Sequence, residues 1–236
     1  TTTVNATGPI TGESAGLRAY NGGGTMDITV TSVDGEFGYG VAIGGEGGDS
    51  VSLTATGAIT SEGRGVNVYG SETVTLSLAS VTAPAGEGGE YGATGEGVVV
   101  STYGYGNNSI SATGPISASL NGVRLDHNSS GDATVSVTSV TAGEDGIRVN
   151  AGGYGEGEYA YSGNVSVTAT DTITAGDDGI RVNAYNSDGL TIDAADITAG
   201  EDGIDVDFEN YYAGETSDVT ITADTIVAGN NGVDLY

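Results

Sequence analysis

Apolar residues recur along this chain at fixed distances from a glycine. The clearest copies read AGEDGIRVNA at 142–151, AGDDGIRVNA at 175–184, AGEDGIDVDF at 199–208 and AGNNGVDLY at 228–236. In each copy the glycine is followed by an aliphatic residue, a variable residue and a second apolar residue. This alternation with a period of two indicates a strand with one buried face. The same pattern extends back through the chain around Gly16, Gly40, Gly65, Gly97, Gly122, Gly146, Gly179, Gly203 and Gly232.

Two columns of apolar residues follow these anchor glycines. The first column is Leu17, Val41, Val66, Val98, Val123, Ile147, Ile180, Ile204 and Val233. The second column is Ala19, Ile43, Val68, Val100, Leu125, Val149, Val182, Val206 and Leu235. Most anchors lie about 24 residues apart, a period typical of solenoids.

Two further apolar stretches precede each anchor. One contributes a single aliphatic residue, mostly six positions before the glycine: Ile10, Ile59, Ile116, Val140, Ile173, Ile197 and Ile226. The other is an alternating run, as in Ile28/Val30, Leu53/Ala55 and Val165/Val167. Together they predict an all-β parallel β-helix of about nine rungs, each rung being one circuit of three short strands. Residues 1–236 then form a single domain.

Composition supports this prediction. The chain is rich in β-branched residues, which suit a pleated and half-buried surface, and its 43 glycines suit tight corners that need positive φ. No stretch has the apolar spacing of a helix. Disorder is the more serious alternative at this glycine content and charge, but a disordered chain has no reason to keep its apolar columns in register.

Charge excludes several functions. The formal net charge is −27, with five arginines and no lysine. Nucleic-acid binding is excluded because phosphate contacts need a basic face, and an anionic membrane surface is disfavoured for the same reason. The chain has no cysteine, and no apolar run approaches the ~18 residues of a membrane span. We therefore expect no membrane insertion.

Acidic pairs occupy equivalent turn positions just before the anchors: Glu144/Asp145, Asp177/Asp178 and Glu201/Asp202. One interpretation is that they splay into solvent, the second acid bonding to its own turn as an Asx-turn. The other is that these oxygen-rich corners bind Ca²⁺. A further calcium-like string is GGEGGDSVS at 44–52, which fits the nonapeptide of Ca²⁺-binding β-rolls and names Asp49 as a ligand.

Outward positions supply two candidate binding surfaces. Arg124, Arg148 and Arg181 should stack between the two buried columns, followed by Asp205 and Asp234. This strip either compensates the acidic corner or binds glycans or carboxylates. Tyrosines gather where the strand after the anchor ends, and either shield the edge or recognise a partner. The tyrosine candidates are Tyr103, Tyr105, Tyr154, Tyr159, Tyr161, Tyr211 and Tyr212.

The sequence gives little support for a catalytic function. A polysaccharide lyase would place arginine and aspartate on such a face, but the absence of lysine disfavours it, and we expect no catalytic residues. The single histidine, His127, lies in a DHNSSG segment and is expected to be exposed and inert. Serine and threonine ladders such as Ser136/Thr138 occur in ice-binding solenoids, and equally on any water-facing strand.

The runs VSLTATGAITSEGRGVNVYG (51–70) and VSVTATDTITAGDDGIRVNAYNSDG (165–189) resemble the passenger repeats of bacterial autotransporter adhesins. The resemblance implies a right-handed β-helix at the cell surface or outside the cell. It also implies a stalk, an adhesin or a filament subunit rather than an enzyme.

From the sequence we therefore expect a structural rod, either a piece of a longer rod or one subunit of it. Self-association, end to end or lateral, is the expected partnership, with surface glycans as a second. No cofactor is required, and Ca²⁺ is the one candidate ion. A glycan-binding module is the principal alternative.

Overall fold

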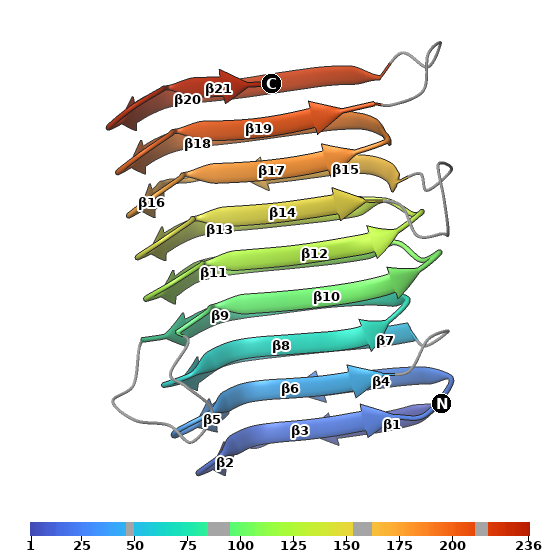
Figure 1. The fold of residues 1–236 in the computed structure, drawn as a ribbon. Helices are drawn as coiled ribbons and strands as arrows, with labels where there is room; N and C mark the ends of the chain where they lie inside the picture. The colour runs from blue at the N-terminus through green and yellow to red at the C-terminus, as the bar shows by residue number, and fades with distance from the viewer. Residues whose placement is uncertain (46–49, 85–94, 153–161, 211–216) are drawn as a thin grey trace.

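The computed structural model describes residues 1–45, 50–84, 95–152, 162–210 and 217–236. These residues form strands and no helix, and every strand pairing among them is parallel. The chain winds upward through stacked circuits, with its two ends at opposite ends of the stack (Figure 1). The predicted parallel β-solenoid is confirmed.

One sheet contains nine strands, one from each rung, and we call it the anchor sheet because its strands follow the anchor glycines. In order of sequence they are β3 (Ala15–Asn21), β6 (Tyr39–Gly45), β8 (Arg64–Ser71), β10 (Val98–Gly104), β12 (Val123–Ser129), β14 (Ile147–Gly152), β17 (Ile180–Tyr185), β19 (Ile204–Glu209) and β21 (Val233–Leu235). Eight steps of ~4.8 Å between these strands give a stack about 40 Å tall.

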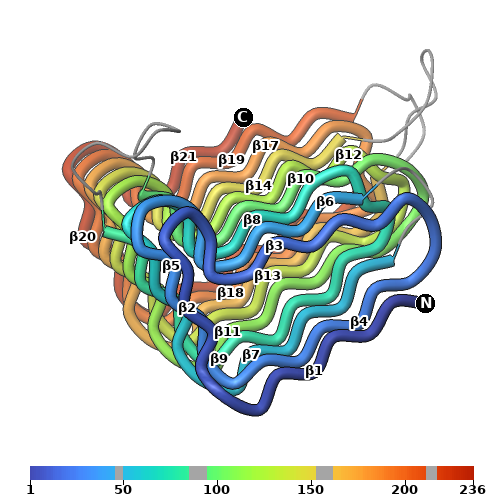
Figure 2. The backbone as a smooth tube through the Cα atoms, turned by 90° about the horizontal axis from the view of Figure 1, so that it is seen from below, coloured from blue at the N-terminus to red at the C-terminus, as the bar shows by residue number. Residues whose placement is uncertain are grey.

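The second sheet contains twelve strands and bends around the remaining sides of the coil. Its strands are β1 (Thr2–Ala6), β2 (Ile10–Gly12), β4 (Thr25–Val30), β5 (Val33–Gly35), β7 (Ser50–Ser61), β9 (Thr73–Ala83), β11 (Asn108–Ala118), β13 (Ala133–Ala142), β15 (Ser162–Ala169), β16 (Ile173–Ala175), β18 (Ser187–Ala199) and β20 (Asp218–Ala228). Seen from the N-terminal end, the chain runs clockwise as it recedes, so the coil is right-handed (Figure 2).

Three segments per rung are present, but the first two often join. They are separate strands in β1/β2, β4/β5 and β15/β16, and one continuous strand in β7, β9, β11, β13, β18 and β20. Irregular pairing marks the bend, for example between Ala55 and Ala58 of β7. The corner is therefore a bend within a strand, because inter-rung hydrogen bonding resumes directly after it.

The core consists of the predicted columns. Ile147 pairs with Ile180, and Ile180 with Ile204, and all three side chains are fully buried. The second column stacks in the same way, as in Leu125 on Val149 and Val149 on Val182. Alternate side chains point inward, so successive rungs bury one another's aliphatic groups, which is how a solenoid is stabilised.

The anchor glycines serve close packing rather than unusual backbone angles. None of them has positive φ; that conformation occurs at other glycines such as Gly70 and Gly104. A Cβ placed on Gly146 would lie 2.5 Å from the carbonyl oxygen of Gly179 and 2.5 Å from a methyl group of Ile173. The expected role of glycine at these corners is thus corrected for the anchors: the neighbouring rung leaves no room for a side chain.

Candidate functional site

The residues directly before the later anchor glycines, from Gly97 to Gly232, form a polar column at one edge of the anchor sheet. Asp145 and Asp178 are buried there, and Asp202 is half-buried. Each carboxylate oxygen Oδ1 accepts a hydrogen bond from the backbone N–H of the next rung. The distances are 3.4 Å from Asp178 N to Asp145, 3.0 Å from Asp202 N to Asp178, and 2.8 Å from Asn231 N to Asp202. We call this column the aspartate ladder.

The aspartate ladder departs from the expected Asx-turns, in which each second acid bonds within its own turn. Here the turns of adjacent rungs lie one strand spacing apart, so a carboxylate reaches the next rung's backbone instead. The first acid of each pair has a different environment: Glu144 is half-buried, and Asp177 and Glu201 are exposed. The two members of each pair therefore differ, one linking rungs and the other facing water.

Arginines stack beside the aspartate ladder in the predicted outward column. Arg124 pairs in register with Arg148, and Arg148 with Arg181. Stacked guanidinium groups repel one another, so each needs a carboxylate nearby. Ion pairs with the aspartate ladder join Arg148 to Asp145 at 3.7 Å and Arg181 to Asp178 at 3.5 Å.

Further carboxylates complete this arginine ladder. Arg124 lies 2.9 Å from Asp126 and 3.6 Å from Glu96, and Arg181 lies 3.4 Å from Asp205 on the next strand. Each of the three stacked guanidinium groups thus has a carboxylate of its own chain. This arrangement favours charge compensation over a free strip for acidic ligands.

Burial changes the proton affinity of two carboxylates beside the arginines. Desolvation raises the pKa of Asp145, opposed by the N–H of Asp178 and the charge of Arg148. Desolvation also raises the pKa of Asp205, opposed by Arg181. Both groups gain protons more readily in the folded rod than in the unfolded chain.

The described residues contain no group of three or more His, Cys, Asp or Glu side chains arranged to bind a metal ion, so they form no preformed calcium site. The oxygens of Asp145 and Asp178 already face N–H groups and arginines. Asp49, the candidate of the nonapeptide string, lies outside the described residues. The calcium hypothesis for the corners stays a prediction.

Sequence reasoning missed Glu96, which occupies the same column as Asp145. It is buried, with its Oε2 2.6 Å from Nε of Arg64 and its Oε1 3.6 Å from Nη1 of Arg124. Its position directly before Gly97 was the available signal. Glu96 lies just before β10 and therefore compensates arginines on both neighbouring strands, Arg64 of β8 and Arg124 of β12.

His127 is not the exposed residue that was expected. Its ring is fully buried, with Nδ1 2.7 Å from the amide nitrogen of Asn108 and Nε2 2.8 Å from the carbonyl oxygen of Gly131. The amide donates to Nδ1, so the ring is neutral with its proton on Nε2. Burial lowers the pKa of His127, against the opposing influence of Gly131 and Asp132.

Asn108, also missed, completes this buried cluster. Its amide nitrogen donates to Thr102 Oγ1 at 2.9 Å, and its Oδ1 accepts from Val74 N at 2.9 Å. The local DHNSSG sequence could not reveal this, because Asn108 lies at the start of β11, 19 residues before His127.

The tyrosine candidates are only partly placed. Tyr103 and Tyr105 are exposed at the end of β10. The others, Tyr154, Tyr159, Tyr161, Tyr211 and Tyr212, lie outside the described residues. No shared tyrosine surface at this edge follows from the described part of the chain.

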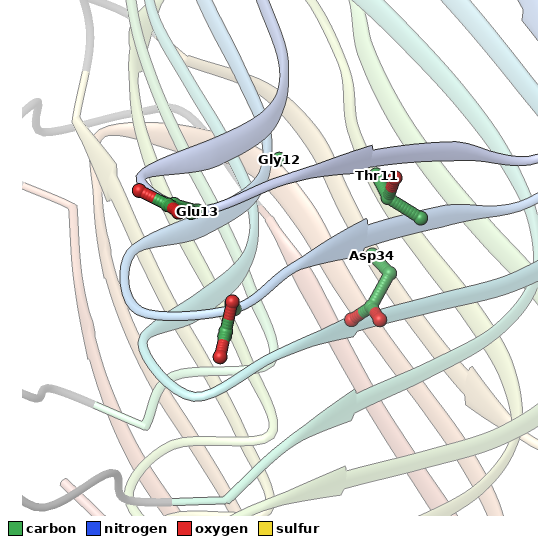
Figure 3. A pocket seen from close by; sticks show the side chains of 5 residues that line it. Thr11, Gly12, Glu13 and Asp34 are labelled. Atoms are coloured by element: carbon green, nitrogen blue, oxygen red, sulfur yellow. The ribbon is translucent and has the colours of Figure 1, made fainter.

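A hollow of about 320 Å³ lies at the corner of the first rungs, lined by Thr11, Gly12, Glu13, Asp34 and Glu36 (Figure 3). Asp34 accepts a 2.6 Å hydrogen bond from Thr60. The lining offers carboxylates without an accompanying cation or histidine. We assign it no ligand.

No protein-family model, curated protein sequence or solved structure matches this chain. The fold itself defines the class: a parallel β-solenoid built from a glycine-anchored repeat. Among the described residues there is also no helix with the length and apolar character needed to cross a membrane.

Proposed function

We propose that this chain is a structural unit of an extracellular or cell-surface rod, the stalk of an adhesin or the subunit of a filament, without catalysis. The observation that carries the proposal is the continuity of the stack. Its apolar columns and hydrogen-bond ladders run from β3 to β21 in one sheet and from β1 to β20 in the other. Such continuity makes a stiff body of uniform cross-section.

Polar contacts along one edge reinforce the same axis. The aspartate ladder joins four successive rungs through three hydrogen bonds, in addition to the strand hydrogen bonds. Charge-assisted hydrogen bonds of this kind are stronger than neutral ones. The acidic skin, at a net charge of −27, keeps separate rods apart in water unless salt or cations screen it.

The two outer rungs are suited to further rungs of the same kind, whether these come from the same chain or another copy. Following each column through the stack, Ile221 of β20 would meet Val4 of a following β1, and Ile226 would meet Ile10. In the outward column Asp234 would meet Arg18, an opposite charge. The Arg181–Asp205 pair already places such charges on adjacent strands at 3.4 Å. Unpaired strand edges favour this addition.

Sedimentation velocity and electron microscopy of the 1–236 polypeptide test the proposal. At moderate salt we expect rods that lengthen with concentration in steps of about 40 Å, the height of nine stacked strands. Asp234→Arg should weaken association, because it sets two cations against each other. The double variant Arg18→Asp/Asp234→Arg should restore it.

Particles that never elongate at any salt or protein concentration would contradict self-association. Equal association of the single and double charge variants would contradict the register. A Ca²⁺ titration of the same samples tests whether Ca²⁺ bridges acidic rods. If it does, Ca²⁺ should cause lateral association that a chelator reverses.

A further inference from the structure

A groove lies on the outer face of the first three strands of the anchor sheet, and β10 separates these strands from the arginine ladder. Its cavity has a volume of about 320 Å³. Residues that shape it are Arg18 and Tyr20 of β3, Tyr39 and Gly44 of β6, and Asn67 and Tyr69 of β8. Four of these six residues, Arg18, Tyr20, Tyr39 and Tyr69, have aromatic or cationic side chains.

Strand register explains why the face is hollow here. Tyr20, Gly44 and Tyr69 occupy one cross-strand row, and Arg18, Ala42 and Asn67 occupy the next. In these two rows the middle strand contributes only Gly44 and Ala42, whereas its neighbours contribute larger residues; the tyrosine of the middle strand, Tyr39, lies at the start of that strand. A Cβ on Gly44 would lie 2.6 Å from Tyr69 Oη and 2.8 Å from Tyr20 Cδ2, so both rings lean over the glycine.

The two tyrosine walls offer aromatic surface to solvent. Tyr20 is 60% exposed and Tyr69 is 49% exposed. Tyrosine presents a large, rigid, amphipathic surface at low entropic cost, as in binding surfaces built for recognition.

Two hydrogen-bond donors converge on the same groove. Arg64, Arg124, Arg148 and Arg181 each form an ion pair, whereas within the described ranges Arg18 has no carboxylate partner and lies 6.0 Å from the Tyr39 ring centroid. Asn67 accepts from Arg64 Nη1 at 3.3 Å through its Oδ1. Its amide nitrogen has no hydrogen-bond partner among the residues that the structure describes.

We propose that this groove binds a neutral oligosaccharide. The C–H face of one pyranose ring would pack on Tyr69 or Tyr20, and its hydroxyl groups would accept hydrogen bonds from Arg18 and Asn67. Aromatic walls with a few placed polar groups are typical of small-molecule sites, and the volume lies at the small end of their range. A neutral sugar fits better than an acidic one, because one arginine faces a chain of net charge −27.

This inference goes beyond the proposed rod, which needs no ligand. Titration calorimetry and saturation-transfer NMR test it with cellohexaose, maltohexaose and mannohexaose as neutral probes. Hexagalacturonate and a hyaluronan hexasaccharide serve as acidic probes. We expect at least one neutral probe to bind saturably and to shift tyrosine ring resonances.

Three groove variants should weaken sugar binding, each for a different physical reason. Tyr69→Ala removes a stacking wall, and Ala42→Leu fills the floor without removing an aromatic ring; each should weaken binding at least about tenfold. Arg18→Gln should weaken it by a smaller factor. The matched control is Tyr185→Ala on β17, an exposed tyrosine outside the groove, which should bind like the parent.

Circular dichroism of each variant shows whether the fold is intact. Failure of all three neutral probes to bind, or equal affinity of Tyr69→Ala, Ala42→Leu and the parent, would overturn the proposal. Binding of the acidic probes alone would overturn the assignment to a neutral sugar.

Discussion

The anchor sheet has two contrasting regions, the rungs of β3–β8 and those of β12–β19. Both have the same interior, with Ile43 and Ile180 fully buried in equivalent strands. Their outward columns differ. The later region carries Arg124, Arg148 and Arg181, each with an internal carboxylate, whereas the earlier region carries Arg18, Ala42 and Asn67.

The contrast distinguishes the residues that stabilise the coil from the outward-facing residues that can vary between rungs. Where the repeat is most regular, charged residues recur in register and must satisfy one another, because like charges stack one strand spacing apart. Where the repeat varies, a small residue can fall between two large ones and leave a hollow. Regular rungs therefore stabilise the rod, and irregular rungs are the place to look for ligands.

The largest expected effect concerns the shared interior. Ile180→Asp and Ile43→Asp should each destabilise the rod by at least about 4 kcal/mol, because an unpaired carboxylate replaces a core side chain. Denaturant unfolding measures the loss, and Thr191→Asp, at an exposed position of β18, is the control. A mild effect at Ile43 alone would show that the two regions do not share one core.

The next effect concerns the anchor glycines. Gly179→Ala should cost about 1–3 kcal/mol, because its Cβ would lie 2.5 Å from the carbonyl oxygen of Gly203. Gly152→Ala is the matched control, since a Cβ there meets nothing within 4 Å. Equal melting temperatures for the two variants would contradict close packing as the reason for the anchors.

The aspartate ladder should matter on a scale similar to that of the anchor glycines, and only in the later region. Asp178→Ala should cost about 1–3 kcal/mol, because the N–H of Asp202 loses its acceptor. Asp178→Asn keeps an acceptor and should recover part of this. Asp177→Ala, an exposed neighbour, should change stability by less than about 0.5 kcal/mol.

A smaller, pH-dependent effect belongs to His127, which lies on β12, the first strand of the later region. Its pKa is lower in the fold than in the unfolded chain, so its contribution is present above the unfolded value of about 6.5 and is lost as the pH falls through the folded value. The parent should lose stability by up to ~1.4 kcal/mol per pH unit in that window relative to His127→Gln. Comparing the two chains cancels the opposite contributions of Asp145 and Asp205, whose raised pKa values favour the folded state in acid. Parallel curves would contradict the buried neutral ring.

The smallest effect is expected from the arginine ladder. Arg148→Gln should cost at most about 1 kcal/mol, since the side chain of Arg148 is 37% exposed and solvent screens its ion pair. The loss should shrink further at high salt. A cost as large as that of Asp178→Ala would mean that the arginines stabilise the rod more than the backbone-bonded carboxylates.

Much of the fold could be predicted because its signal is local and repeated. Each apolar column is visible as a position relative to a glycine, and stacking follows from repetition. Both inward columns and the arginine column lie in register as expected. The candidate sites were less predictable. His127 is buried and bonds to Asn108, 19 residues earlier in the chain, and the aspartates bond to backbone groups about 24–33 residues away.

The sequence alone thus determined which side chains point inward and that the chain coils. Both follow from local patterns, namely the alternation of apolar residues with a period of two and the recurring anchor glycine. Only the tertiary structure decided which polar atoms meet between rungs. It paired Asp178 with the backbone of Asp202, enclosed His127, and opened a groove over Gly44. The physical reason is that these contacts join rungs across the stack, so they depend on register and on how far each side chain reaches toward its neighbour.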